Sequence, residues 1–203
     1  MKSKTIGIIA LIVCVLIIVV GTFMRGPDLK KYDSLLTPRI TEIPDTKVVE
    51  VAAAGDPNQV GGMAFGLLFK HYYAIKPALR AKFTAPRARW PKSYDTPRKD
   101  WIGLFALPLN PAAVPAVITN DGPYSVTITN WKYGTVAEIL HRGPYSNETP
   151  TVDKLHKFIT AQGYVQTGEH EEEYLRGPDI FGKGDPDKYY TIIRCRVQKK
   201  GAK

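Results

Sequence analysis

The chain has 203 residues and a formal net charge of +9, with 28 Lys and Arg against 19 Asp and Glu. This length allows one or two domains of ordinary size. Of the two cysteines, Cys14 lies in an apolar N-terminal segment and Cys195 near the other end of the chain. An internal disulfide in the domain is therefore excluded, and the redox compartment stays open.

The N-terminal segment predicts a membrane anchor. Residues 6–24 are 19 residues without a charge and follow a short basic start, residues 1–5. As a helix they would be about 28 Å long, close to the hydrocarbon thickness of a bilayer. The run exceeds a signal-peptide core and no A-x-A-like site follows it, so we expect a single-pass signal anchor that is not cleaved. Lysine and arginine flank both ends; we favour a domain outside the cytoplasm, periplasmic or extracellular.

Residues 25–45 are polar and interrupted by prolines, which is typical of a tether. The domain proper is expected at 46–198, followed by a basic tail at 199–203. Within it, residues 70–99 carry nine Lys or Arg against one acid, Asp95. A solvated loop is the simpler interpretation, and contact with anionic lipid headgroups is the functional one. Nucleic acid is not expected as a partner, because no helix-turn-helix or zinc-ligand spacing accompanies the charge.

An internal repeat organises the domain. TKVVEVAAAGDPN (46–58) resembles GTVAEILHRGPYSN (134–147), with Glu50 and Glu138 aligned at an offset of 88 residues. WIGLFALPLN (101–110) aligns with YYTIIRCRVQ (189–198) at the same offset. Two separated patterns that share one offset indicate a duplication, with halves at about 46–110 and 124–198.

Each half predicts a strand, a turn, a helix and two further strands. The strands are expected at about 47–54 and 135–142, and the helices at GMAFGLLFKHYYAI and PTVDKLHKFITAQ. In the second helix apolar residues recur every three or four positions, and Thr149 suits its N-cap. The expected fold is α+β: duplicated βαββ halves with pseudo-twofold symmetry, an antiparallel sheet and helices on one face.

The second half resembles the GyrI-like, or effector-binding, domain of bacterial multidrug-sensing regulators, a fold related to the SOUL type. The resemblance is carried by the strand-GPY-helix unit, an E-x-Y-L-x-x-P segment (Glu172 to Pro178) and a closing strand after a Pro-Asp turn. It covers roughly residues 46–198 and is weaker in the first half, where GDPN replaces GPY. It implies a groove between the halves for small amphipathic or cationic molecules.

The resemblance assigns Glu172 as the acidic residue of that groove and Tyr174 as its aromatic, with Glu173 as an alternative because EEE leaves the register open by one residue. On a strand, successive residues face opposite sides, so only one register is correct. A carboxylate among aromatic walls suits a cation through charge pairing and cation–π attraction. Plausible wall residues, each with ordinary packing as its alternative, are Tyr145, Trp131, Tyr124 and Trp101.

The expected function is a membrane-anchored small-molecule binding domain for sensing or sequestration. The resemblance also implies an alternative, a hydrolase of reactive cyclopropane-bearing toxins with Glu172 as general base and Tyr174 as its helper. A protein-interaction platform is a second alternative. No cofactor is expected, and no metal site either, because no His, Cys or carboxylate cluster has ligand spacing in the sequence.

Overall fold

The computed structural model describes residues 28–201 except 83, 93–95, 122 and 179–183. The chain divides into two compact units, Met1–Asp33 and Ser34–Lys203, of which the second is considered below. The predicted anchor, residues 6–24, lies outside the described residues. Among the helices that are described, none is both long and apolar enough to cross a membrane.

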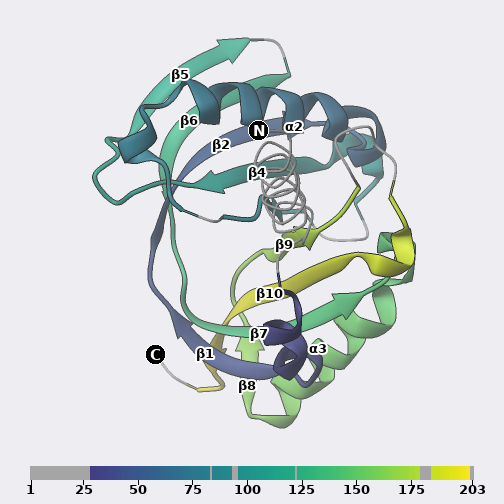
Figure 1. The fold of residues 1–203 in the computed structure, drawn as a ribbon. Helices are drawn as coiled ribbons and strands as arrows, with labels where there is room; N and C mark the ends of the chain where they lie inside the picture. The colour runs from purple at the N-terminus through teal and green to yellow at the C-terminus, as the bar shows by residue number, and fades with distance from the viewer. Residues whose placement is uncertain (1–27, 83, 93–95, 122, 179–183, 202–203) are drawn as a thin grey trace, which may run out of the picture. The chain divides into compact units, whose positions relative to one another are not determined.

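The second unit is built on one antiparallel sheet with the strand order β1-β7-β10-β9-β3-β4-β2-β6-β5 (Figure 1). The short strand β8 pairs with β10 beside this path. The strands are β1 (Arg39–Ile43), β2 (Thr46–Ala54), β3 (Arg87–Trp90), β4 (Ile102–Pro108), β5 (Ala116–Asp121), β6 (Tyr124–Trp131), β7 (Gly134–Arg142), β8 (Tyr164–Gln166), β9 (His170–Arg176) and β10 (Tyr190–Lys199).

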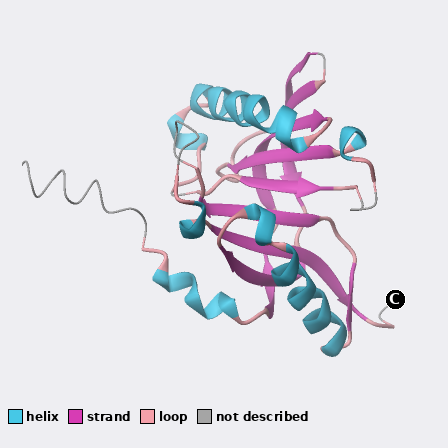
Figure 2. Cartoon of the chain, turned by 90° about the vertical axis from the view of Figure 1, so that its right-hand side faces the viewer, coloured by secondary structure: helices cyan, strands magenta, loops and turns pink. Residues whose placement is uncertain are grey.

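Two α-helices cover one face of this sheet (Figure 2). Helix α2 (Pro57–Ala74) packs Ala64, Leu68 and Tyr72 onto β2, β4 and β6, and α3 (Thr149–Ala161) packs Val152, Leu155 and Ile159 onto β7 and β10. Burial of these apolar stripes is what holds both helices on the sheet. Short 3-10 helices are η1 (Lys30–Leu36), η2 (Pro77–Leu79), η3 (Arg98–Asp100), η4 (Tyr145–Asn147) and η5 (Pro186–Lys188). The α+β class with an antiparallel sheet is therefore confirmed.

The strand pairing reproduces the offset of 88 residues found in the sequence. Strand β2 pairs with β4, and β7 pairs with β10. Moving both partners of Val51↔Phe105 along the chain by 88 positions gives Ile139↔Ile193, which is also an observed pair. The sequence repeat therefore corresponds to one supersecondary unit used twice.

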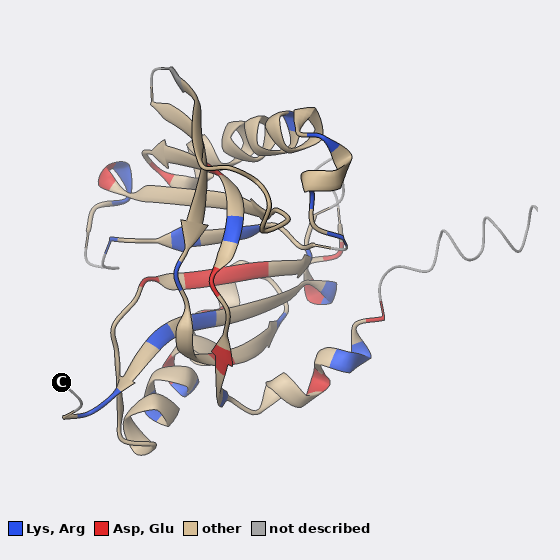
Figure 3. Ribbon diagram, turned by 90° about the vertical axis from the view of Figure 1, so that its left-hand side faces the viewer, with Lys and Arg blue, Asp and Glu red and all other residues tan. Residues whose placement is uncertain are grey.

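Strands β9 and β3 join the two halves at the centre of the sheet. Arg87 lies opposite Glu173, and Arg89 lies opposite Glu171. Because side chains alternate along a strand, these four face the side away from the helices. Figure 3 shows the acidic band of β9 with basic patches on neighbouring strands.

A buried ion-pair network forms on that side. Glu171 accepts hydrogen bonds from Arg89 Nε at 2.7 Å, from Arg194 Nη1 at 3.0 Å and from the Tyr133 hydroxyl at 2.9 Å. Arg194 also contacts Glu173 at 2.8 Å and Glu138 at 3.2 Å. Burial alone would raise the pKa of the Glu173 carboxyl, but Arg87 and Arg194 outweigh it and hold that pKa below its usual value. The network therefore neutralises acidic side chains that the fold has removed from water.

Part of the predicted tether, residues 25–45, belongs to the sheet instead. Residues 39–43 form β1, which pairs with β7 from Arg39↔Glu138 to Ile43↔Gly134. Arg39 also donates to the Glu138 carboxylate at 2.7 Å. Prolines at 38 and 44 flank the strand without entering it, which is why proline-rich composition alone gave the wrong boundary.

Arg194→Ala is expected to destabilise the fold by about 3–5 kcal/mol, because it leaves buried glutamates without their shared cation. Chemical denaturation of the full chain measures this effect. Lys199→Ala, at the exposed end of the same strand, is the matched control and should change stability by less than about 0.5 kcal/mol. Equal stability of the two variants would contradict the role given to the network.

Candidate functional site

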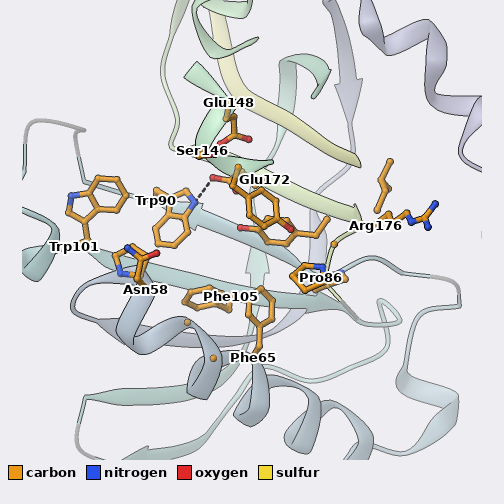
Figure 4. Close-up of a pocket in the computed structure, with 18 of the residues that line it drawn as sticks. Asn58, Phe65, Pro86, Trp90, Trp101, Phe105, Ser146, Glu148, Glu172 and Arg176 are labelled. Atoms are coloured by element: carbon orange, nitrogen blue, oxygen red, sulfur yellow. Dashed lines mark hydrogen bonds between the residues drawn. The ribbon is translucent and has the colours of Figure 1, made fainter. Parts of the chain in front are cut away.

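A cavity of about 960 Å³ lies between α2, strands β3, β4 and β9, and the segment that leads into α3 (Figure 4). The first half contributes Phe65, Trp90, Trp101 and Phe105, and the second half contributes Tyr145, Glu148, Glu172 and Tyr174. The cavity therefore lies between the two halves and takes residues from both. Its size is in the usual range for small-molecule sites, which run from about 300 to 1,000 Å³.

Glu172 supplies a buried carboxylate in this cavity; the residue is 8% exposed. The indole Nε1 of Trp90 donates to Glu172 Oε1 at 2.8 Å, and His170 Nε2 lies 3.2 Å from the same oxygen. The Tyr174 hydroxyl also hydrogen-bonds this carboxylate. Among the residues that the structure describes, no Lys or Arg forms an ion pair with it. Glu172 is thus oriented by hydrogen bonds but is not neutralised by a strong base.

Aromatic rings gather around this carboxylate, three of the four ring pairs edge-to-face and the Trp90–Trp101 pair tilted. Trp90 lies 5.6 Å from Phe105, ring centroid to ring centroid, and 5.7 Å from Trp101. Tyr174 lies 5.7 Å from Tyr145 and 5.8 Å from Phe65. Such contacts fix the ring positions and present both ring faces and edges to the cavity.

Three of the positions at which α2 faces the cavity are glycines, which have no side chain. Gly61, Gly62 and Gly66 all contribute to the lining, and a Cβ at any of the three would meet nothing within 4 Å. These glycines lower the helix propensity of α2. Larger residues at these positions would occupy cavity space, so the glycine pattern widens the site at a cost in helix stability.

Glu148 is a second acid in the cavity. It occupies the N-cap position of α3, which the sequence assigned to Thr149, yet its side chain makes no capping hydrogen bond. The residue is 8% exposed and its Oε1 has no hydrogen-bond partner. Burial, together with the negative charge of Glu172, raises the pKa of the Glu148 carboxyl to about 9. Near neutral pH this group therefore holds its proton.

The two tyrosines of the cavity stay protonated as well. Burial, assisted by the charge of Glu172, raises the pKa of Tyr174 and of Tyr145 above the usual value for a phenol. Both hydroxyls are therefore hydrogen-bond donors across the physiological pH range. Protonated Glu148 and these two phenols therefore add no negative charge to the cavity near neutral pH.

The structure separates the residues that the sequence proposed for the groove. Glu172, Tyr174, Tyr145 and Trp101 line the cavity. Glu173 does not, because it points to the opposite face and pairs with Arg87 and Arg194. Trp131 lies on that same face, where its indole donates to Glu50 at 2.6 Å. Tyr124 packs against the core under α2 and is not a cavity residue.

The sequence analysis missed Trp90, Glu148 and His170, as well as the cavity rings of Phe65 and Phe105. Trp90 lies in the basic stretch 70–99, which was interpreted by its charge and not by its aromatic residues. Glu148 lies between the GPY turn and the start of a helix, where a glutamate is common and indicates no site. His170 is two positions before Glu172, so strand alternation would have placed it on the same face. That alternation is the one signal in the sequence that could have found it.

Comparison with solved structures identifies the fold. An uncharacterized conserved protein from Listeria innocua matches with a TM-score of 0.66 at 21% identity, over 84% of this chain and 97% of that one. A hydrolase from the same organism matches with a TM-score of 0.62 at 19% identity, again over 84% and 97%. The EcmrR C-terminal domain matches with a TM-score of 0.58 at 20% identity, over 80% and 97%.

The chain has the GyrI-like fold. This agrees with the resemblance noted in the sequence. No protein-family model and no curated protein matches the sequence. In this chain the fold places a cavity between its two halves, and the chemistry of that cavity follows from its own residues.

Proposed function

We propose that this protein binds a small amphipathic organic cation and that Glu172 supplies the counter-charge. The observation that carries the proposal is a buried carboxylate, oriented by Trp90 and Tyr174, in a cavity walled by aromatic rings. A cation over a desolvated aromatic face gains about 2 kcal/mol, and the nearby carboxylate adds to this attraction. Sensing or sequestration of such a molecule is the role that this site supports.

The positions of the charges favour a cation over an anion. The two arginines of the lining, Arg98 and Arg176, are solvent-exposed, whereas Glu148 and Glu172 are buried. Figure 4 shows the guanidinium of Arg176 pointing away from Glu172. Exposed charges are screened by water and salt, so the two arginines oppose the attraction between a bound cation and the buried Glu172 carboxylate only weakly.

The basic stretch 70–99 does not add a nucleic-acid partner to this proposal. Arg87 and Arg89, two of its nine basic residues, are engaged in the ion-pair network on the far face of the sheet. Their charge is already matched by Glu173 and Glu171. The lysines of the stretch are exposed, and we propose that they contact anionic lipid headgroups.

Ethidium, a fluorescent aromatic cation, is a suitable probe. The full chain should bind it with a rise in fluorescence, and Glu172→Gln should weaken binding at least ~10-fold, because the substitution removes the counter-charge but keeps the side-chain shape. The anionic fluorophore anilinonaphthalene sulfonate should bind more weakly than ethidium to the unmodified protein.

Glu42→Gln is the matched control, since Glu42 is an exposed residue of β1 outside the cavity. It should leave ethidium affinity unchanged. Equal ethidium affinity in the Glu172→Gln, Glu42→Gln and unmodified proteins would refute the proposed counter-charge.

Hydrolysis of a reactive small molecule is a second candidate, favoured by the hydrogen bond between the Tyr174 hydroxyl and Glu172. A hydrolase also shares this fold. Glu172 would take a proton from water as the water oxygen bonds to a carbon of a strained cyclopropane. The ring C–C bond would break, and Tyr174, which retains its proton, would protonate the released end of the opened ring.

Incubation of the full chain with a cyclopropane-bearing electrophile in ¹⁸O-labelled water tests this candidate. The product should gain one ¹⁸O and the elements of one water molecule by mass spectrometry, and Glu172→Gln should abolish turnover. Substrate that is bound and recovered intact would leave binding as the function and exclude this hydrolysis.

We also propose that residues 6–24 anchor the protein in a membrane as a single pass, with the domain outside the cytoplasm. The support is the uncharged run of 19 residues. The full chain should stay with membranes after alkaline carbonate extraction, and a C-terminal alkaline phosphatase fusion should be active. Release of the protein by carbonate would contradict the anchor. A fusion that is stably produced but inactive would contradict the proposed orientation.

A further inference from the structure

Glu148 and Glu172, which line the cavity, lie next to a third side chain with a metal-binding atom, His170. A ligand atom from each lies within 4.8 Å of the other two. Glu148 comes from the start of α3, while His170 and Glu172 are alternate residues of β9 and so face the same side. A nitrogen and two carboxylates from separate elements thus converge on one point.

The second observation is the unsatisfied carboxylate of Glu148. The side chain is more than nine-tenths buried, and its Oε1 has no hydrogen-bond partner among the described residues. In Figure 4 its carboxylate lies next to that of Glu172, on the same side of the cavity. Buried polar atoms are almost always paired, and two neighbouring acids repel each other once both are ionised. The partner that would satisfy both is a positive charge between them.

The distances suit a metal ion. Two ligands each about 2.0–2.1 Å from a tetrahedral Zn²⁺ lie roughly 3.3 Å apart. His170 Nε2 and Glu172 Oε1 are separated by 3.2 Å, which is close to this spacing. The ligand atoms of all three residues lie within 4.8 Å of one another, so rotation of the Glu148 side chain can complete the set.

We propose that Glu148, His170 and Glu172 form a binding site for a divalent transition-metal ion of the Zn²⁺ type. An imidazole with two carboxylates suits Zn²⁺ better than Ca²⁺ or Mg²⁺, which prefer oxygen ligands alone. Three protein ligands leave one position open, as in zinc sites that bind water or a small molecule.

Neighbouring side chains already orient one of these ligands. Trp90 Nε1 donates to Glu172 at 2.8 Å, and the Tyr174 hydroxyl hydrogen-bonds the same carboxylate. Hydrogen bonds of this kind hold metal-binding carboxylates in place and typically affect affinity 10- to 100-fold. The site therefore has both ligands and a supporting shell.

The metal site does not rest on the proposed binding of organic cations, although both use Glu172. The two cations would compete, since they need the same carboxylate. Glu148 distinguishes them: the metal requires it as a ligand, whereas ethidium requires only the charge of Glu172. The two proposals can therefore fail separately.

The test is a titration of the chelator-treated full chain with ZnCl₂, followed by dialysis and elemental analysis. The unmodified protein should retain about one Zn²⁺ per chain, and Co²⁺ in its place should show the intense visible bands of four- or five-coordinate geometry. Glu148→Gln and His170→Ala should each weaken Zn²⁺ binding at least ~10-fold. Each metal-free variant should still unfold cooperatively on heating, which shows that it is folded.

His156→Ala is the control for adventitious binding, because His156 is exposed on α3 and lies outside the cavity. It should bind Zn²⁺ like the unmodified protein. Failure to retain stoichiometric Zn²⁺, unchanged affinity in Glu148→Gln, or loss of binding in His156→Ala would each overturn the metal site. Ethidium bound by a protein that retains no Zn²⁺ would refute the metal site and leave the proposed function standing.

Discussion

Strands β3 and β9 pair at the centre of the sheet, with Ala88 opposite Glu172 and Arg89 opposite Glu171. This register decides the chemistry of both faces, because neighbouring side chains on a strand face opposite ways. Glu171 and Glu173 meet arginines on one face and are neutralised there. Glu172 meets tryptophan, histidine and tyrosine on the other, and no lysine or arginine of the described residues pairs with it there. A slip of one residue would exchange these environments and remove the charge from the cavity.

The same pairing makes the cavity a product of both halves of the repeat. The first half supplies its indole and phenyl rings and the glycine-rich side of α2, and the second half supplies its acids and tyrosines. The duplicated units have therefore diverged in chemistry while they keep the same strand register. Glu50 and Glu138 illustrate the divergence: equivalent in the repeat, one accepts from Trp131 and the other pairs with Arg39 and Arg194.

Much of the fold was predictable because it repeats. The offset of 88 residues located four strands, and the apolar period of α3 located its buried face. Strand β1 was missed because flanking prolines resemble a tether. In the site, the run EEE left Glu172 and Glu173 as alternatives, since a pattern of identical residues carries no register information. Aromatic residues were equally ambiguous: Tyr145 and Trp101 line the cavity, whereas Trp131 packs on the opposite face.

The sequence by itself determined the repeat, the α+β class and the presence of an acidic strand in a basic domain. These properties are local or periodic and can be read along the chain. Only the tertiary structure decided which glutamate lines the cavity, and only it brought Glu148 next to His170 and Glu172. Glu148 is more than 20 positions before the other two and belongs to a different element, and the packing of α3 against the sheet sets its distance from them. Spacing along the chain does not encode such proximity, so a site assembled between elements becomes visible only in the fold.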